Sequence, residues 1–338
     1  MSSFDLRALD VPVIVAPMAG GPTTPELAAA GSNAGGLGFL AGGYLTAEVF
    51  AQRITAARGL TTGPLGANLF VPQPSAARPD AIHKYANRLV GESKRYGVRL
   101  GDARFDDDQW AAKLDVVLDL KPEVVSFTFG LPEADECARL RGAGITTVAT
   151  VTTLADAEVA VARGVDAVAI QGPDAGGHRG TFDPVAAPPT QPLAQLLRAT
   201  TIALEVPVIA AGGLMTAVDV ADVTVSGAVA AQLGTAFLLA DEAGSSPVHR
   251  AALTDPQFVE TAVTRCFSGR YARGLRNRFV DEHDAEAPFG YPEVHYLTSP
   301  VRAASVRAGD PHGVNVWAGT GYRKAKAGSV AEIIAALI

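Results

Sequence analysis

The chain has 338 residues, of which 48% are hydrophobic and 19% charged, and its formal net charge at pH 7 is −7. This charge provides no basic surface for nucleic acid or an anionic membrane, so neither is expected as a partner. Two cysteines are too few for a disulfide scaffold or a cysteine-based zinc site, and they fit a reducing compartment. With no signal-peptide pattern and no apolar run of membrane-spanning length, the sequence predicts a soluble cytoplasmic protein.

Short apolar runs alternate with Ala-rich helical stretches up to about residue 240. The runs are continuously apolar, which is typical of parallel strands covered on both faces. Eight strands are predicted, at residues 11–17, 37–41, 64–71, 123–130, 145–151, 166–170, 206–213 and 228–235. Eight parallel βα units favour an α/β fold of the closed (β/α)8 TIM-barrel type. An open doubly wound sheet is the alternative, disfavoured because no GxGxxG turn opens the first unit.

Two regions depart from this alternation of predicted strands and helices. Residues 75–120 are helical and more charged, and they are predicted to form an extended crossover helix pair inserted in the barrel. From residue 242 onward, aromatic residues, Arg, Gly and Pro occur without strand or helix periodicity, which indicates a smaller, mostly helical and looped lid over one barrel mouth. The predicted division is a barrel over 1–241, a lid subdomain over 242–325 and a C-terminal helix within 326–338 that returns to the barrel.

The turns after the last two predicted strands carry the sequences "AGG" (211–213) and "LGT" (233–235). In (β/α)8 barrels these two loops and a helix N-terminus form the usual phosphate site. Plain turn chemistry is the alternative, less favoured for the pair than for either loop alone. Since the sequence has no Walker-type Lys, the phosphate is expected to belong to a bound cofactor.

Three polar side chains follow predicted strands at the same barrel mouth. Asn68 and Gln171 offer amide donors and acceptors that suit a heterocycle such as an isoalloxazine ring; a hydrogen bond to a neighbouring loop is the alternative. His178 lies in "GPDAGGHRGTF" (172–182), where glycines allow a ligand to approach closely. An imidazole with a pKa near ~6.5 suits a general base, so catalysis or substrate binding is expected there. The other histidines are interpreted as structural: His83, His249, His283, His295 and His312.

Two other kinds of site are disfavoured. The sequence has no GxSxG elbow, which argues against a Ser/His/Asp hydrolase. Asp174 and His178 could approach one ion, but no further ligand cluster is visible, so no metal site is predicted.

Several motifs, in order from about residue 11 to 325, closely resemble the bacterial nitronate monooxygenases, formerly called 2-nitropropane dioxygenases. They are "APMAGGPTTPELAAAGSNAGGLGFLAGGY", "ANLFVP", "QGPDAGGHRG", "AAGGLMT", "QLGTAFLLADEAG", "FSGRYARGLRNRF", "YPEVHYLT" and "WAGTGYRKA". The resemblance implies a barrel that binds FMN non-covalently and oxidises alkyl nitronates, typically propionate 3-nitronate, with O2 to a carbonyl compound and nitrite. The implied course is one-electron transfer from nitronate to flavin, followed by reaction with O2.

The resemblance also assigns residues. His178 would abstract a carbon-bound proton from neutral nitroalkanes or hold the anionic nitronate. Arg179 and the arginines of "GRYARGLRNR" are candidate partners for a substrate carboxylate, although most of them are more simply solvated or paired on the lid. The residues expected to bind FMN are Pro17, Met18, Asn68, Gln171, Gly176, Gly177, Gly212, Gly213, Gln232, Leu233, Gly234 and Thr235.

Some positions depart from the family pattern. Asp174 stands where these proteins usually carry Glu, and Thr320 replaces a Gln that would lie near the flavin. The phosphate turns are intact, so FMN binding is expected more firmly than the exact substrate. An FMN-dependent NAD(P)H:quinone or enoyl-thioester reductase on the same barrel is the alternative activity, and a flavin- or phosphate-binding protein without turnover is a third reading. The sequence is compatible with a monomer or a homodimer.

Overall fold

A closed barrel of eight parallel strands forms the larger part of the computed structural model, which describes residues 4–338. Each barrel strand pairs with the next barrel strand along the chain, β6 with β8 included, and β9 pairs back onto β1. The predicted (β/α)8 barrel is therefore confirmed. Its strands are β1 (Val13–Val15), β2 (Leu37–Ala41), β3 (Leu65–Phe70), β4 (Val124–Thr128), β5 (Thr146–Val151), β6 (Ala167–Gln171), β8 (Val208–Ala211) and β9 (Ala230–Leu233).

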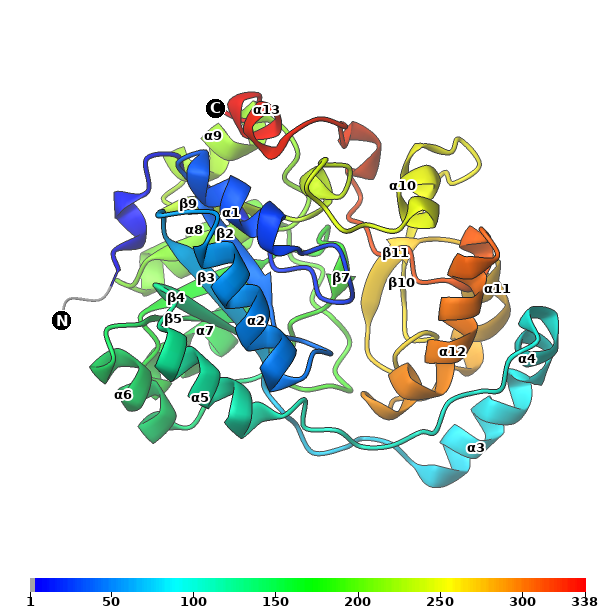
Figure 1. The fold of residues 1–338 in the computed structure, drawn as a ribbon. Helices are drawn as coiled ribbons and strands as arrows, with labels where there is room; N and C mark the ends of the chain where they lie inside the picture. The colour runs from blue at the N-terminus through cyan, green and yellow to red at the C-terminus, as the bar shows by residue number, and fades with distance from the viewer. Residues whose placement is uncertain (1–3) are drawn as a thin grey trace.

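Helices cover the outside of this barrel (Figure 1). They are α1 (Pro25–Asn33), α2 (Ala47–Arg58), α5 (Trp110–Leu120), α6 (Ala134–Gly142), α7 (Leu154–Arg163), α8 (Leu193–Ala203) and α9 (Ala217–Val225). The first of them begins as predicted, because the Thr24 hydroxyl accepts a hydrogen bond from the Leu27 N–H and Pro25 takes the first helical position. The last helix, α13 (Val330–Ala335), packs beside α1.

Alternate side chains of the strands point to opposite sides of the barrel wall. Val13 and Val15 pack in the cluster between strands and helices, whereas Ile14 joins Phe39 in a separate cluster inside the barrel. Leu6, on the short 3-10 helix η1 (Leu6–Ala8), is buried in the same inner cluster. This packing closes the N-terminal end of the barrel and leaves the opposite end for a ligand.

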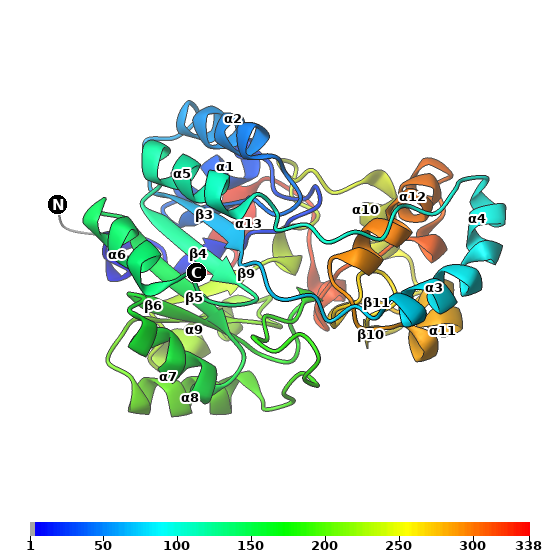
Figure 2. The same ribbon diagram turned by 90° about the horizontal axis from the view of Figure 1, so that it is seen from below.

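A second lobe lies over the other end of the barrel, as Figures 1 and 2 show from two directions. It contains a three-stranded antiparallel sheet in the order β10-β11-β7, a feature that the sequence analysis did not predict. Its strands and helices are β7 (Gly177–His178), α10 (Pro247–Thr254), β10 (Thr261–Thr264), β11 (Ala272–Leu275), α11 (Arg278–His283) and α12 (Glu293–Arg307). Four 3-10 turns connect the two lobes or the lid helices: η2 (Thr235–Phe237), η3 (Asp284–Glu286), η4 (Pro311–Gly313) and η5 (Tyr322–Lys324).

The helix pair predicted over 75–120 is three helices in the structure. The first two, α3 (Pro79–Arg88) and α4 (Val90–Tyr96), pack with α11 and α12 of the second lobe, around Tyr85 and Phe279. The third, α5, packs on α2 as an ordinary barrel helix. The domain limits at residues 241 and 325 stay a prediction. No helix of residues 4–338 combines the length and apolar character needed to cross a membrane.

Candidate functional site

One cavity of about 530 Å³ lies between the C-terminal end of the barrel and the second lobe. Its volume falls within the range of ligand-binding pockets. The predicted catalytic histidine and all twelve residues expected to bind FMN line it. They are Pro17, Met18, Asn68, Gln171, Gly176, Gly177, His178, Gly212, Gly213, Gln232, Leu233, Gly234 and Thr235.

The turns after β8 and β9 have the form of an anion site. Gly212 and Gly213 adopt positive φ values of 110° and 80°, which side chains other than glycine rarely tolerate. Within residues 4–338, no protein acceptor receives the backbone N–H of Gly213, Gly234 or Thr235. The Thr235 hydroxyl accepts a hydrogen bond from the Gly319 N–H at 2.9 Å, so its own proton remains to be donated. Unpaired amides at such turns fit a phosphate group.

The two predicted amide side chains differ in what they leave free. Asn68 donates through Nδ2 to the Ser126 and Thr128 hydroxyls at 2.9 and 3.0 Å, while its Oδ1 receives no hydrogen bond from residues 4–338. Gln171 uses both ends of its amide within its own loop, since Nε2 donates to the His178 carbonyl at 3.0 Å and Oε1 accepts from the Gly180 N–H at 2.9 Å. Gln171 therefore fixes the loop that carries His178.

The glycines beside His178 have a packing reason. A Cβ at Gly176 would lie 2.5 Å from backbone atoms of Ala318 and Gly319, so only glycine permits this close approach. Gly177 has a φ of 75° and opens onto the cavity with no atom near the place of a Cβ. The next residue, His178, pairs with Ala272 of β11, so the histidine belongs both to the barrel loop and to the lid sheet.

The His178 imidazole lies in a mostly aromatic pocket. Its Nε2 is 2.8 Å from the Ser268 hydroxyl, and the rings of Phe129, Tyr291 and Trp317 surround it at centroid distances of 5.5 to 5.8 Å. Burial, aided by the positive charges of Arg270 and Arg302, lowers the pKa of His178 to about 3. The imidazole is therefore neutral near pH 7 and can accept a proton.

The arginines named as candidate carboxylate partners do not line this cavity. Arg179 donates to the carbonyls of Gln171 and Gly172, and Arg270 donates to Gln73 and the Thr181 carbonyl. The remaining three, Arg273, Arg276 and Arg278, bind protein oxygens of the lid and its neighbouring loops.

Arg302 on α12 instead reaches the cavity, together with His295 from the same helix and His249 from α10. Both histidines were interpreted as structural, and Arg302 was not singled out. The spacing of His295 and Arg302, two turns apart on one helix face, was present in the sequence. Which face of helix α12 borders the cavity depends on how the two lobes pack together, and local sequence does not show this.

Thr320 lies away from the position that the resemblance implied. Its side chain is exposed, it does not line the cavity, and its backbone N–H donates to the Asp174 carbonyl at 3.1 Å. The neighbouring Gly319 and Gly321 line the cavity instead. Thr320 therefore contributes no side chain to the cavity wall.

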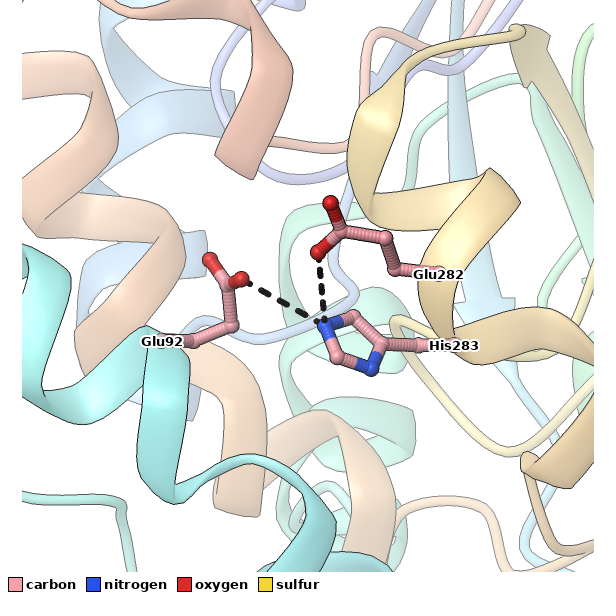
Figure 3. A group of neighbouring side chains, drawn as sticks. All are labelled: Glu92, Glu282 and His283. Carbon is pink, nitrogen blue, oxygen red and sulfur yellow. Dashed lines mark hydrogen bonds and ion pairs between the residues drawn. The ribbon is translucent and has the colours of Figure 1, made fainter.

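A separate acidic cluster joins α4 to α11 (Figure 3). Glu92 and Glu282 lie 3.4 and 3.9 Å from Nε2 of His283. Both carboxylates are also bound by Arg278, which meets the two oxygens of Glu92 at 2.5 and 2.8 Å. Arg278 together with Arg95, which lies 3.9 Å from Glu92, supplies two positive charges for the two carboxylates, so this cluster is an ion-pair network that links the inserted helices to the lid.

A (β/α)8 barrel with a glycine-lined site for a phosphate and a neutral histidine beside it fits an enzyme that binds a phosphate-bearing cofactor. The sequence profile of the family described as nitronate monooxygenase matches residues 5–338, and the chain belongs to this family. It is accordingly a flavin-dependent oxidoreductase.

Individual relatives agree with this assignment. The chain is 38% identical to the nitronate monooxygenase of Paraburkholderia phytofirmans, over 98% of this chain and 92% of the relative. It is 36% identical to a probable nitronate monooxygenase of Bacillus subtilis, over 94% and 91% of the two chains. The crystal structure of a nitroalkane oxidase from Streptomyces ansochromogenes superposes with a TM-score of 0.94 at 47% identity, covering 98% of this chain and 95% of that one.

Proposed function

We propose that the protein binds FMN in this cavity and oxidises alkyl nitronates, of the propionate 3-nitronate type, and nitroalkanes with O2 to a carbonyl compound and nitrite. One observation carries the proposal: the unpaired amides after β8 and β9 and the neutral His178 line the same cavity. The names of the relatives above support the same substrate class.

The cavity residues fit FMN. The amides of Gly213, Gly234 and Thr235 would bind its phosphate, since no protein group occupies them. The free Oδ1 of Asn68 would accept a hydrogen bond from the ring system. When bound, the flavin supplies the electron acceptor for substrate oxidation.

His178 supplies the proton chemistry. His178 is neutral at pH 7, but a pKa of about 3 makes it a weak base in the free site. It can take a carbon-bound proton from a nitroalkane because the anionic nitronate formed beside the imidazolium supplies a negative charge that raises this pKa. The positive charges of Arg270 and Arg302, which oppose protonation of the free site, favour the anion once it is bound. A substrate that arrives as the nitronate needs no proton removal, so His178 then binds the anion.

Purification followed by cofactor release and mass measurement tests the cofactor, and nitrite formation with O2 uptake tests the reaction. The proposal predicts about one FMN per chain, and nitrite from propionate 3-nitronate without added NADH. A protein that binds no FMN, or one that oxidises NADH and forms no nitrite, would contradict it. The second result would favour the reductase alternative. The cytoplasmic location and the choice between monomer and homodimer stay predictions.

A further inference from the structure

Helix α12 brings an arginine into the cavity wall without a carboxylate partner. The Arg302 guanidinium is bound only by neutral groups: Nε donates to the Thr298 hydroxyl at 3.1 Å, and Nη1 donates to Oδ1 of Asn315 at 3.0 Å. Its Nη2 donates to the carbonyl of His295 at 2.9 Å and lies 3.2 Å from Nδ1 of the same residue. No carboxylate of residues 4–338 lies within 4 Å of it. The cavity wall therefore holds an uncompensated positive charge.

This contact determines where His295 carries its proton. A guanidinium has donors and no acceptor, so Nδ1 of His295 must accept and must be unprotonated. Burial and the charge of Arg302 hold the pKa of His295 well below its usual range, so the ring is neutral. A neutral imidazole with an unprotonated Nδ1 has its proton on Nε2.

The Nε2–H of His295 is available to a ligand. The ring lines the cavity, stacks on Tyr44 at a centroid distance of 4.1 Å and shares Tyr291 as a neighbour with His178. No acceptor in residues 4–338 receives its Nε2–H. The adjacent guanidinium withdraws charge through Nδ1, which makes the N–H a stronger donor to an anion.

We propose that His295 is a second substrate-binding imidazole, whose Nε2–H donates a hydrogen bond to a nitro or nitronate oxygen, and that Arg302 is its positioning residue. The inference rests on the proposed function and assigns a residue that the activity alone does not identify. When a proton leaves the carbon of a nitroalkane, negative charge moves to the nitro oxygens. A donor fixed in advance at those oxygens stabilises that charge as it forms.

Two variants of His295 separate its donor from its ring. His295→Phe keeps the stack on Tyr44 and removes the donor, whereas His295→Gln places an amide N–H near the position of Nε2–H. We expect kcat/KM for nitroethane, whose nitro oxygens gain charge as the proton leaves, to fall about 100-fold in His295→Phe, as for loss of one preorganised donor, and to stay within several-fold of wild type in His295→Gln. Equal losses in both variants, at unchanged FMN content and melting temperature, would overturn the proposal.

Arg302 is tested by its coupling to His295. Arg302→Met should lower kcat/KM, and the double variant with His295→Phe should be no worse than His295→Phe alone, because Arg302 acts through the imidazole. Arg302→Lys retains a charged donor, so it should keep more activity than Arg302→Met. It also replaces Arg302→Met as the test variant if Arg302→Met does not fold. Additive losses in the double variant would show that Arg302 binds substrate directly, and would overturn its positioning role.

A measurement independent of turnover uses the FMN-loaded protein labelled with 15N in its histidines. We expect His295 to show a protonated Nε2 and an unprotonated Nδ1, without titration between pH 6 and 8, and its Nε2 resonance should shift when nitrite is added as an unreactive anion. The opposite tautomer, a charged ring, or no shift with saturating nitrite would contradict the inference. If wild type forms no nitrite from nitronates but this shift occurs, the proposed function fails and the anion-binding role of His295 stands.

Discussion

The Nε2 atom of His178 lies 2.8 Å from the hydroxyl oxygen of Ser268, which in turn donates to the carbonyl of Arg270 at 3.2 Å. With that donation in place, the hydroxyl accepts from His178, so the imidazole proton is on Nε2 and Nδ1 is the free base. Ser268 comes from the lid and His178 from a barrel loop. Contact between the two lobes therefore sets which nitrogen of His178 is unprotonated.

Replacing Ser268 with Ala removes this partner and frees the orientation of the ring. We expect kcat/KM for nitroethane to fall about tenfold, less than the 10² to 10⁴ for loss of a general base because the imidazole itself remains, with a smaller change for propionate 3-nitronate, which needs no proton removal. Steady-state nitrite formation with both substrates measures the difference. Equal losses for the two substrates would show that Ser268 does not act through the base.

His178→Asn removes the base itself. Oxidation of neutral nitroalkanes should fall by about 10² to 10⁴, as for loss of a general base, while FMN stays bound. Nitronate oxidation should fall less, because that substrate arrives deprotonated. A rate on nitroethane that is unchanged from wild type would exclude His178 as the base.

The lowered pKa of His178 has a consequence for stability. The pKa of His178 is about 3 in the folded protein against an ordinary pKa of 6.5, so between these pH values the unfolded chain binds the additional proton. The contribution of His178 therefore destabilises the folded state as pH falls from about 6.5 toward 3, by at most about 1.4 kcal/mol per pH unit. In urea unfolding between pH 7 and 5, His178→Gln should lose less stability than wild type. An identical pH dependence in the two proteins would contradict the lowered pKa.

Gly176→Ala tests the close contact between the His178 loop and residues 318 and 319. A methyl group there would lie 2.5 Å from backbone atoms that have no free space. We expect a loss of about 1–3 kcal/mol in stability, as for overpacking, together with reduced FMN content. Gly91→Ala is the matched control, because a Cβ there meets no atom within 4 Å and helix α4 favours Ala. Equal effects of the two changes would argue against the contact.

The ion pairs of Arg278 with Glu92 and Glu282, the two glutamates drawn in Figure 3, predict a difference between these acidic residues. Glu92→Gln should destabilise the protein by about 3 kcal/mol, because it leaves the buried side of Arg278 without its charge partner. Glu282, whose side chain is 47% exposed, should contribute under about 1 kcal/mol. Urea unfolding of Glu92→Gln and Glu282→Gln measures both values. Similar small losses of unfolding free energy in both variants would show that these ion pairs do not stabilise the packing of the inserted helices on the lid.

Local sequence patterns were sufficient for the barrel. Continuous apolar runs predicted the bounds of β2 correctly and those of the other seven barrel strands within a few residues. This worked because parallel strands buried on both faces are apolar along their whole length. The lid sheet lacks that signal: β10 is only partly buried, and β7 is two residues long. Its strands are defined by pairing with each other and with the His178 loop, which local sequence does not encode.

The same contrast holds within the cavity. Residues at strand ends, such as Gly213 and His178, could be placed because the barrel fixes where strand ends meet. His295 and Arg302 could not be placed, because their helix reaches the cavity only through packing of α12 with α3 and α4 in the second lobe. This packing brings together segments about 200 residues apart in the sequence. The hydrophobic periodicity within one segment does not predict such contacts.

Nitronate oxidation by bound FMN is tested most directly by an anaerobic visible spectrum of the FMN-loaded protein, recorded before and after addition of propionate 3-nitronate, with NADH added to a parallel sample. We expect the nitronate to change the flavin spectrum within the mixing time of the experiment, NADH to leave it unchanged, and nitrite to appear when O2 is admitted. A flavin that is bleached by NADH and unaffected by the nitronate would contradict it.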